Sequence, residues 1–195
     1  TVYTPDEINV LSQVLKKHDL LLHMDGARFA NAVAKIGCSP AEMTWKVGVD
    51  ALSFGTTKNG TLGAEAAIFF NDTEDGSFIY RRMRSGHLVS KMRFVSAQII
   101  AYIENDLWLK NAEHANEMAE KLYKGVHGVG GIKFTYPAES NVMFAEIHED
   151  IRDKLWQAGF RFYTRNMSDG TSSRLVTAFN TDSSEIDKFI QIVKS

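Results

Sequence analysis

Apolar residues in the first part of the chain recur at two different spacings, which predicts helices alternating with strands. Between Asp6 and His18 they recur at helical spacing, and residues 27–36 are typical of a helix that ends at Gly37. Three short apolar runs have the length of buried strands: 19–24, 49–55 and 64–70. Because only residues 56–63 separate the last two runs, we expect these two strands to pair antiparallel. The order of elements predicts an α/β layer.

The pattern changes twice in the second part of the chain. From Ser77 to Lys124 it is mostly helical, and the glycine-rich segment 125–131 then predicts a break. After this break we expect four strands and two helices: strands 132–137, 141–147, 160–165 and 173–179, and helices 149–159 and 182–195. We therefore predict that 1–91 is part of a larger domain, 92–125 a connecting helix and 126–195 a small α+β domain.

Two short segments have the residue order of a helix start. Thr4-Pro5-Asp6-Glu7 combines a capping threonine, a proline at the first helical position and acids in the first turn. Ser39-Pro40-Ala41-Glu42 has a similar order and predicts a second start. The chain reaches the first cap almost at once and does not begin with methionine, so we expect a piece of a longer protein.

Composition argues against a nucleic-acid-binding, membrane-spanning or disulfide-bonded protein. The formal net charge of -2 gives no reason to expect nucleic acid or an acidic membrane as a partner. No apolar run approaches the roughly 20 residues that a membrane-spanning helix needs. Cys38 is the single cysteine, so no disulfide can form within the chain, which favours a reducing compartment such as the cytoplasm.

An aspartate and a lysine follow two neighbouring predicted strands. Asp25 ends the apolar part of "LLLHMDGARFANA" (20–32), at the edge of a sheet where α/β proteins bind ligands. A structural role is open as well: Asp25 pairs with Arg28 or caps the next helix. Lys58 lies among threonines and glycines in "SFGTTKNGTLG" (53–63). A desolvated lysine there acts as a nucleophile or forms a Schiff base, whereas the alternative is a surface lysine in a polar turn.

Taken together, these two residues are more specific than either one alone. Lys58 follows Asp25 by 33 residues, each of them just past a predicted strand. Pyridoxal phosphate needs such a pair, because a lysine amine bonds to its aldehyde and a carboxylate keeps its ring nitrogen protonated. The pair therefore predicts a pyridoxal phosphate site.

Four stretches of the sequence resemble those of a known family. The stretches that carry the resemblance are "HMDGARFANA" (23–32), "DALSFGTTKNGTLGAEAAIFF" (50–70), "SGHLVSKMRFVSAQ" (85–98) and "SRLVTAFNT" (173–181). They resemble the threonine aldolases within the fold-type I pyridoxal phosphate enzymes, and more narrowly the bacterial low-specificity L-threonine aldolases. The resemblance implies part of the large, mostly parallel α/β domain of that fold, followed by a small C-terminal α+β domain.

The resemblance also assigns roles to individual residues. Lys58 would carry the cofactor, Asp25 would pair with the ring nitrogen and Ala27 would pack on a ring face. Arg28 would approach the cofactor's phenolic oxygen. Arg174 would hold the substrate carboxylate, a task that suits a guanidinium because it grips a carboxylate with two hydrogen bonds.

The implied reaction is the retro-aldol cleavage of β-hydroxy-α-amino acids. L-Threonine or L-allo-threonine would give glycine and acetaldehyde, in a homodimer or homotetramer. The resemblance places the general base and most of the phosphate-binding loop outside this chain. By their position before the lysine, Thr56 and Thr57 are candidates for contact with the phosphate.

Other functions stay open. A phenylserine aldolase or a β-eliminating lyase uses the same aspartate and lysine, and a catalytically incomplete fragment would explain the abrupt start. A metal site has weaker support, since the sequence has no HExxH motif and no paired cysteines. We interpret His23 as a strand residue with a hydrogen-bond partner. Segment 125–131, "GVHGVGG", does not match the dinucleotide-binding fingerprint.

Overall fold

The computed structural model describes residues 1–71, 76–167 and 170–195. The chain divides into two compact units. The N-terminal unit is Tyr3–Lys110, and the C-terminal unit is Asn111–Ser195 together with Thr1–Val2. The domain boundaries predicted near residues 91 and 125 lie on either side of this division and stay a prediction.

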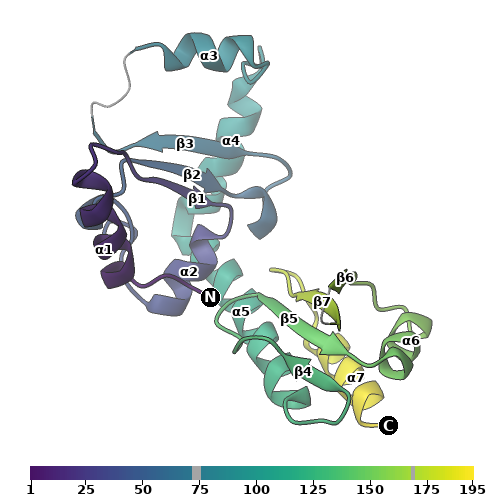
Figure 1. Ribbon diagram of the computed structural model, residues 1–195. Coiled ribbons are helices and arrows are strands. Elements are labelled where there is room, and N and C mark those ends of the chain that lie inside the picture. Colours follow the sequence, from purple (N-terminus) through teal and green to yellow (C-terminus); the bar gives the residue numbers. More distant parts are fainter. Residues whose placement is uncertain (72–75, 168–169) are drawn as a thin grey trace. The chain divides into compact units, whose positions relative to one another are not determined.

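The N-terminal unit is built on a three-stranded sheet of order β1-β2-β3 (Figure 1). Strands β1 and β2 run parallel, and β2 pairs antiparallel with β3, as the short connection between their sequences predicted. The elements of this unit are α1 (Pro5–Lys16), β1 (His23–Gly26), α2 (Phe29–Ile36), η1 (Trp45–Val47), β2 (Ala51–Gly55), η2 (Thr57–Asn59), β3 (Glu65–Phe69), α3 (Phe78–Arg84), α4 (Met92–Ile103), η3 (Glu104–Asp106) and the start of α5 (Leu107–Val126).

The two faces of this sheet differ in polarity because alternate residues of a strand point to opposite sides. Leu52 and Phe54 of β2 are buried on one face, where Phe54 contacts the rings of Phe29, Tyr102 and Trp108 at centroid distances of 6.1–6.2 Å. These rings come from α2, α4 and α5, so helices cover this face. The opposite face carries the exposed polar side chains of β1 and β2, including Asp25.

Three predicted elements of this unit need correction. The first strand begins at His23, because Asp19 takes a left-handed conformation (φ 54°) that turns the chain before it. Ser39 and Glu42 make the reciprocal bonds of a helix cap, yet no α-helix follows; the chain forms η1 and turns at Gly48 (φ 89°). The helical region from Ser77 onward is broken twice, after α3 and after α4.

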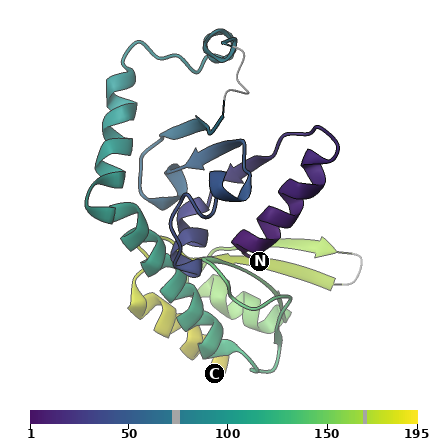
Figure 2. The ribbon, with the colours of Figure 1, turned by 90° about the vertical axis from the view of Figure 1, so that its left-hand side faces the viewer.

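The C-terminal unit contains a four-stranded antiparallel sheet of order β4-β5-β7-β6. Figure 2 shows α5 and α7 side by side against this sheet. Buried residues of both helices, such as Leu122 and Phe189, form one apolar core with Met143 and Leu175 of the central strands. The elements are the remainder of α5, then β4 (Ile132–Phe134), β5 (Val142–Ile147), α6 (Glu149–Gln157), β6 (Tyr163–Met167), β7 (Gly170–Val176) and α7 (Ser183–Lys194).

The break predicted in segment 125–131 is present, but it does not begin at Gly125. Helix α5 continues through Gly125 and ends at Val126. A Cβ atom on Gly125 would lie 2.3 Å from Ile190 Cδ1 of α7, so the glycine serves close helix packing here. The chain turns only at Gly128 and Gly131, both of which have positive φ.

Within the described ranges, none of the helices combines the length and the apolar character that crossing a membrane requires.

Candidate active site

Asp25 lies one residue before the carboxyl end of β1. Its side chain is on the exposed face of the sheet, and Ser53 of β2 stands opposite it in the parallel pairing. Asp25 Oδ1 accepts a hydrogen bond from the backbone N–H of Ala27 at 3.0 Å. This bond fixes the turn that leads into α2, so the carboxylate has a structural role in addition to any chemical one.

His23 and Ser53 make a second polar contact on the same face. His23 Nε2 lies 2.8 Å from Ser53 Oγ, which confirms the interpretation of His23 as a strand residue with a hydrogen-bond partner. Among the described residues, no three histidine, cysteine or acidic side chains gather as metal ligands would. The exposed face of β1 and β2 carries a row of polar side chains: His23, Asp25 and Ser53.

Lys58 lies in the short 3-10 helix η2, three residues after β2 ends. Its side chain is exposed, which matches the surface lysine that the sequence left open as the alternative to a desolvated one. The threonine and glycine neighbours have too little surface to cover a four-carbon side chain. In the part of the chain that the structure describes, Lys58 forms no ion pair, so its amine is available to a ligand.

The loop that carries Lys58 is held by hydroxyl groups. Thr56 is fully buried; its hydroxyl donates to the carbonyl oxygen of Ala64 and lies 2.8 Å from Thr61 Oγ1. Thr57 Oγ1 accepts from the backbone N–H of Ala64 at 3.3 Å. The hydroxyl of Thr56 therefore points into the loop, and this geometry does not support the predicted contact between Thr56 and a phosphate.

The Asp25 loop and the Lys58 loop meet through backbone contact. Because β1 and β2 are parallel, both loops leave the same edge of the sheet. A Cβ atom built on Gly55 would lie 2.6 Å from Ala27 Cα and 3.0 Å from the carbonyl oxygen of Gly26. Only glycine at position 55 allows this approach. The two loops therefore meet at one edge of the sheet, and they bring Asp25 and Lys58 to that edge.

We predict that Gly55→Ala separates these two loops. The added methyl group would overlap the backbone at Ala27, which cannot move as a side chain end does. We expect a loss of about 1–3 kcal/mol in the free energy of unfolding, measured by urea denaturation, together with weaker binding of pyridoxal phosphate. Gly63→Ala is the matched control, because its added methyl group meets no atom within 4 Å. Equal stability of the two variants would contradict this account of the contact.

Asn59 is a residue of this region that the sequence analysis missed. Its side chain is 4% exposed, and Nδ2 donates to Tyr102 Oη at 2.6 Å and to the carbonyl oxygen of Trp108 at 2.8 Å. Burial raises the pKa of Tyr102 to about 12, against the lowering effect of the bond from Asn59, so the phenol stays protonated at neutral pH. An asparagine beside a glycine looks like an ordinary turn in the sequence, and no signal there identifies its burial.

The other two predicted cofactor residues lie next to Asp25. Ala27 follows Gly26 and is half-buried, and its backbone lies beside Gly55 at the end of β2. Arg28 precedes the first residue of α2 and its Nε is buried. Asp25, Ala27 and Arg28 therefore lie around the end of β1, at the sheet edge from which the Lys58 loop also leaves.

Arg174 belongs to the C-terminal unit, on the central strand β7. Its guanidinium carbon lies 5.1 Å from the ring centre of Tyr163. The two residues line a surface hollow of about 420 Å³, together with Phe144, Thr164, Arg165 and Ser172. Its role toward the substrate carboxylate stays a prediction.

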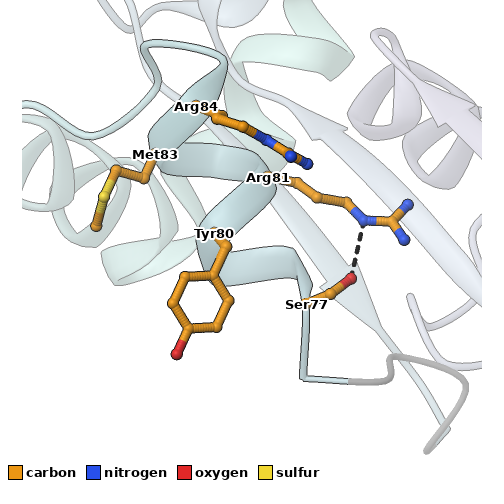
Figure 3. A pocket seen from close by; sticks show the side chains of 5 residues that line it. All are labelled: Ser77, Tyr80, Arg81, Met83 and Arg84. Atoms are coloured by element: carbon orange, nitrogen blue, oxygen red, sulfur yellow. Dashed lines mark hydrogen bonds between the residues drawn. The ribbon is translucent and has the colours of Figure 1, made fainter.

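A second hollow lies beside α3 and is lined by two of its arginines, Arg81 and Arg84. Figure 3 shows Arg81 and Arg84 extending to one side of α3 and Met83 to the other. Arg81 Nε donates to Ser77 Oγ at 2.8 Å. This contact holds one arginine along the first turn of its own helix.

Comparison with known proteins identifies the family. The family model described as beta-eliminating lyase matches residues 1–150. The chain belongs to the beta-eliminating lyase family. Enzymes of this family depend on pyridoxal phosphate, which is the cofactor predicted from Asp25 and Lys58.

Two curated relatives carry a more specific name. The chain is 44% identical over 182 residues to a low specificity L-threonine aldolase of Pseudomonas aeruginosa, covering 93% of this chain and 52% of the relative. It is 42% identical over 186 residues to the low specificity L-threonine aldolase of another Pseudomonas strain, covering 95% and 53%. The chain thus spans about half the length of the curated relatives it matches. The resemblance stated from the motifs is confirmed.

Solved structures confirm the predicted fold class. The chain is similar to a threonine aldolase of Leishmania major, with a TM-score of 0.89 and 28% identity, over 98% of this chain and 56% of that one. It is also similar to a serine palmitoyltransferase of Sphingomonas wittichii, with a TM-score of 0.67 and 15% identity, over 99% and 50%. The latter likeness shows the fold alone. The chain therefore has the α/β architecture of fold-type I enzymes.

Proposed function

We propose that the native gene product is a pyridoxal phosphate-dependent lyase that cleaves L-threonine and L-allo-threonine to glycine and acetaldehyde. The observation that carries this proposal is the meeting of the Asp25 and Lys58 loops at one sheet edge through Gly55 and Ala27. The family, and the names of the two Pseudomonas relatives, support the same reaction.

The residues of this edge fit the cofactor. The exposed amine of Lys58 is accessible to an aldehyde, and the carboxylate of Asp25 lies on the uncovered face of the sheet. Between them, Ala27 is small enough for a flat ring to lie close to the backbone. The chemistry that pyridoxal phosphate supplies when bound is a ring that accepts the electron pair of the broken bond.

We assign a separate task to each residue. Lys58 would hold the cofactor covalently and later exchange its place with the substrate amine. Asp25 would stabilise a proton on the ring nitrogen, since a carboxylate beside a cation favours the charged form. Arg28 would lie near the phenolic oxygen. The base that removes the proton of the substrate hydroxyl, and the main phosphate-binding group, are not among the residues assigned here.

Arg174 would bind the substrate carboxylate, which leads to a prediction about substrate affinity. We expect Arg174→Ala to lower kcat/KM for threonine by about ten- to a hundredfold, mainly through KM, because a charge-assisted hydrogen-bond pair is lost. Arg165→Ala is the matched control, since Arg165 lines the same hollow. The assignment fails if both variants lower kcat/KM to the same small extent.

β-Elimination is the second candidate reaction, because the matched family model bears that description. A panel of L-threonine, L-allo-threonine, phenylserine and tryptophan, offered to the native gene product, separates the candidates. Acetaldehyde and glycine from the first two substrates support the proposal. Preferential cleavage of phenylserine would indicate a different aldolase, and formation of indole and pyruvate from tryptophan would indicate a β-eliminating lyase.

We further propose that the enzyme acts in the cytoplasm as a homodimer or homotetramer. The single cysteine supports a reducing compartment. Large apolar side chains are exposed along α3, α4 and the segment between them, which is typical of a surface covered by another subunit: Ile79, Tyr80, Met83, Leu88, Val89 and Phe94. Sedimentation of the native gene product as a monomer would refute the assembly.

A further inference from the structure

Asn59 and Lys58 are consecutive residues with opposite environments. The side chain of Lys58 is exposed, while that of Asn59 is buried and donates both of its described hydrogen bonds into the protein. The acceptors are Tyr102 Oη at 2.6 Å and the carbonyl oxygen of Trp108 at 2.8 Å. Because η2 contains only three residues, any shift of Asn59 must also move the backbone of Lys58.

The two partners of Asn59 lie on either side of a break between helices. Tyr102 is in the last turn of α4, and Trp108 is in the first turn of α5. Between them, Asn105 and Asp106 have φ values of 55° and 58°, a left-handed conformation that non-glycine residues seldom adopt. One amide group therefore bridges the break, and beyond it α5 continues into the residues of the C-terminal unit.

The loop of residues 56–63, which carries Lys58, is also hydrogen-bonded to α4 near its end. Gln98 Oε1 of α4 accepts hydrogen bonds from the backbone N–H groups of Leu62 and Gly63, at 3.0 and 3.2 Å. The loop is thus attached to α4 at two places, and both follow Lys58 in the sequence. Of these attachments, only the one through Asn59 adjoins the lysine directly.

We propose that Asn59 is a positioning residue for Lys58, holding the lysine-bearing turn to the α4–α5 break through Tyr102 and Trp108. The inference rests on the proposed role of Lys58 as the cofactor lysine, and it adds a residue that determines where the amine lies. It also makes the conformation of the break a determinant of cofactor binding at Lys58.

The chemistry of the contact favours an asparagine. Both acceptors are oxygen atoms, so the side chain must supply two N–H donors from one atom, which an amide does and a carboxylate does not. The phenol of Tyr102 is buried and neutral, and it can accept the shorter bond without introducing a charge.

Tyr102→Phe is the sharpest test because it removes one hydroxyl group and keeps the ring that packs on Phe54, 6.2 Å away. Tyr123→Phe, on a half-buried tyrosine of the C-terminal unit, is the matched control. Two quantities are measured on the native gene product at a temperature where all variants are folded. The first is hydrogen exchange of the Asn59 backbone amide without cofactor. The second is the association constant of pyridoxal phosphate trapped at Lys58 by borohydride.

We expect Tyr102→Phe to raise the exchange rate of the Asn59 amide and to lower the association constant by about fivefold, the factor expected for one buried neutral hydrogen bond. The control should leave both unchanged. Asn59→Ala, which loses both bonds, should have a larger effect; if that variant does not fold, Tyr102→Phe still decides.

Each contrary result has a distinct meaning. Faster exchange with an unchanged association constant, or no change in either quantity, would overturn the inference and leave the proposed function standing. If pyridoxal phosphate is not trapped at Lys58 in the unmodified protein, the proposed function fails and the inference fails with it.

Discussion

Replacing Lys58 with alanine should abolish threonine cleavage, lowering kcat by more than about 10³-fold, which is the scale of losing a covalently acting group. Lys58 is the lysine in the loop that meets the Asp25 turn, and its amine makes no ion pair within the described residues. Acetaldehyde release, coupled to a reductase that consumes NADH, measures the loss.

A lysine variant outside the site is the control that shows whether the loss of turnover is specific to Lys58. Lys35→Ala, on the exposed side of α2, removes the same charge from the same unit and should leave turnover unchanged. Both variants should unfold at the temperature of the unmodified protein, because neither side chain is buried. Turnover by Lys58→Ala at the unmodified rate would exclude Lys58 as the cofactor lysine.

Asp25→Asn should lower kcat by about 10²–10³-fold, the range observed when one preorganised electrostatic group is removed from an active site. Asparagine has the same shape, and its side-chain oxygen can still accept the hydrogen bond from Ala27 N–H. The turn into α2 should therefore survive, while the negative charge that stabilises a protonated ring nitrogen is lost. Measured kcat and the thermal unfolding temperature distinguish these two roles.

The control for the charge is Asp19→Asn. Asp19 is exposed and has a positive φ of 54°, a conformation that asparagine also tolerates. We expect normal kcat and normal stability for this variant. If Asp25→Asn lost stability but kept kcat, the carboxylate would serve only the turn, which is the structural alternative that the sequence left open.

The sequence predicted the site best where a local pattern of apolar residues is compatible with only one kind of element. The apolar run before Asp25 and the run before Lys58 predicted adjacent strands, and the eight residues of 56–63 predicted an antiparallel third strand. All three strands form, with the two loops at one edge. Resemblance to a family then supplied the cofactor, which periodicity alone does not provide.

The features that the sequence did not reveal depend on contacts between distant segments. Gly125 reads as a helix breaker but serves close packing against Ile190, a residue 65 positions later. The buried amide of Asn59 contacts residues 43 and 49 positions away. The exposure of Lys58 depends likewise on how much surface its neighbours can cover. Such outcomes follow from packing, and the local sequence does not encode them.

The central claim is that Lys58 bonds to pyridoxal phosphate beside Asp25. The most direct measurement is incubation of the protein with pyridoxal phosphate, reduction with borohydride, proteolysis, and location of the pyridoxyl group by mass spectrometry. We predict one modified peptide that contains Lys58, with labelling that is lost in Lys58→Ala and kept in Lys35→Ala. Labelling spread over several exposed lysines, or concentrated at a lysine other than Lys58, would contradict the claim.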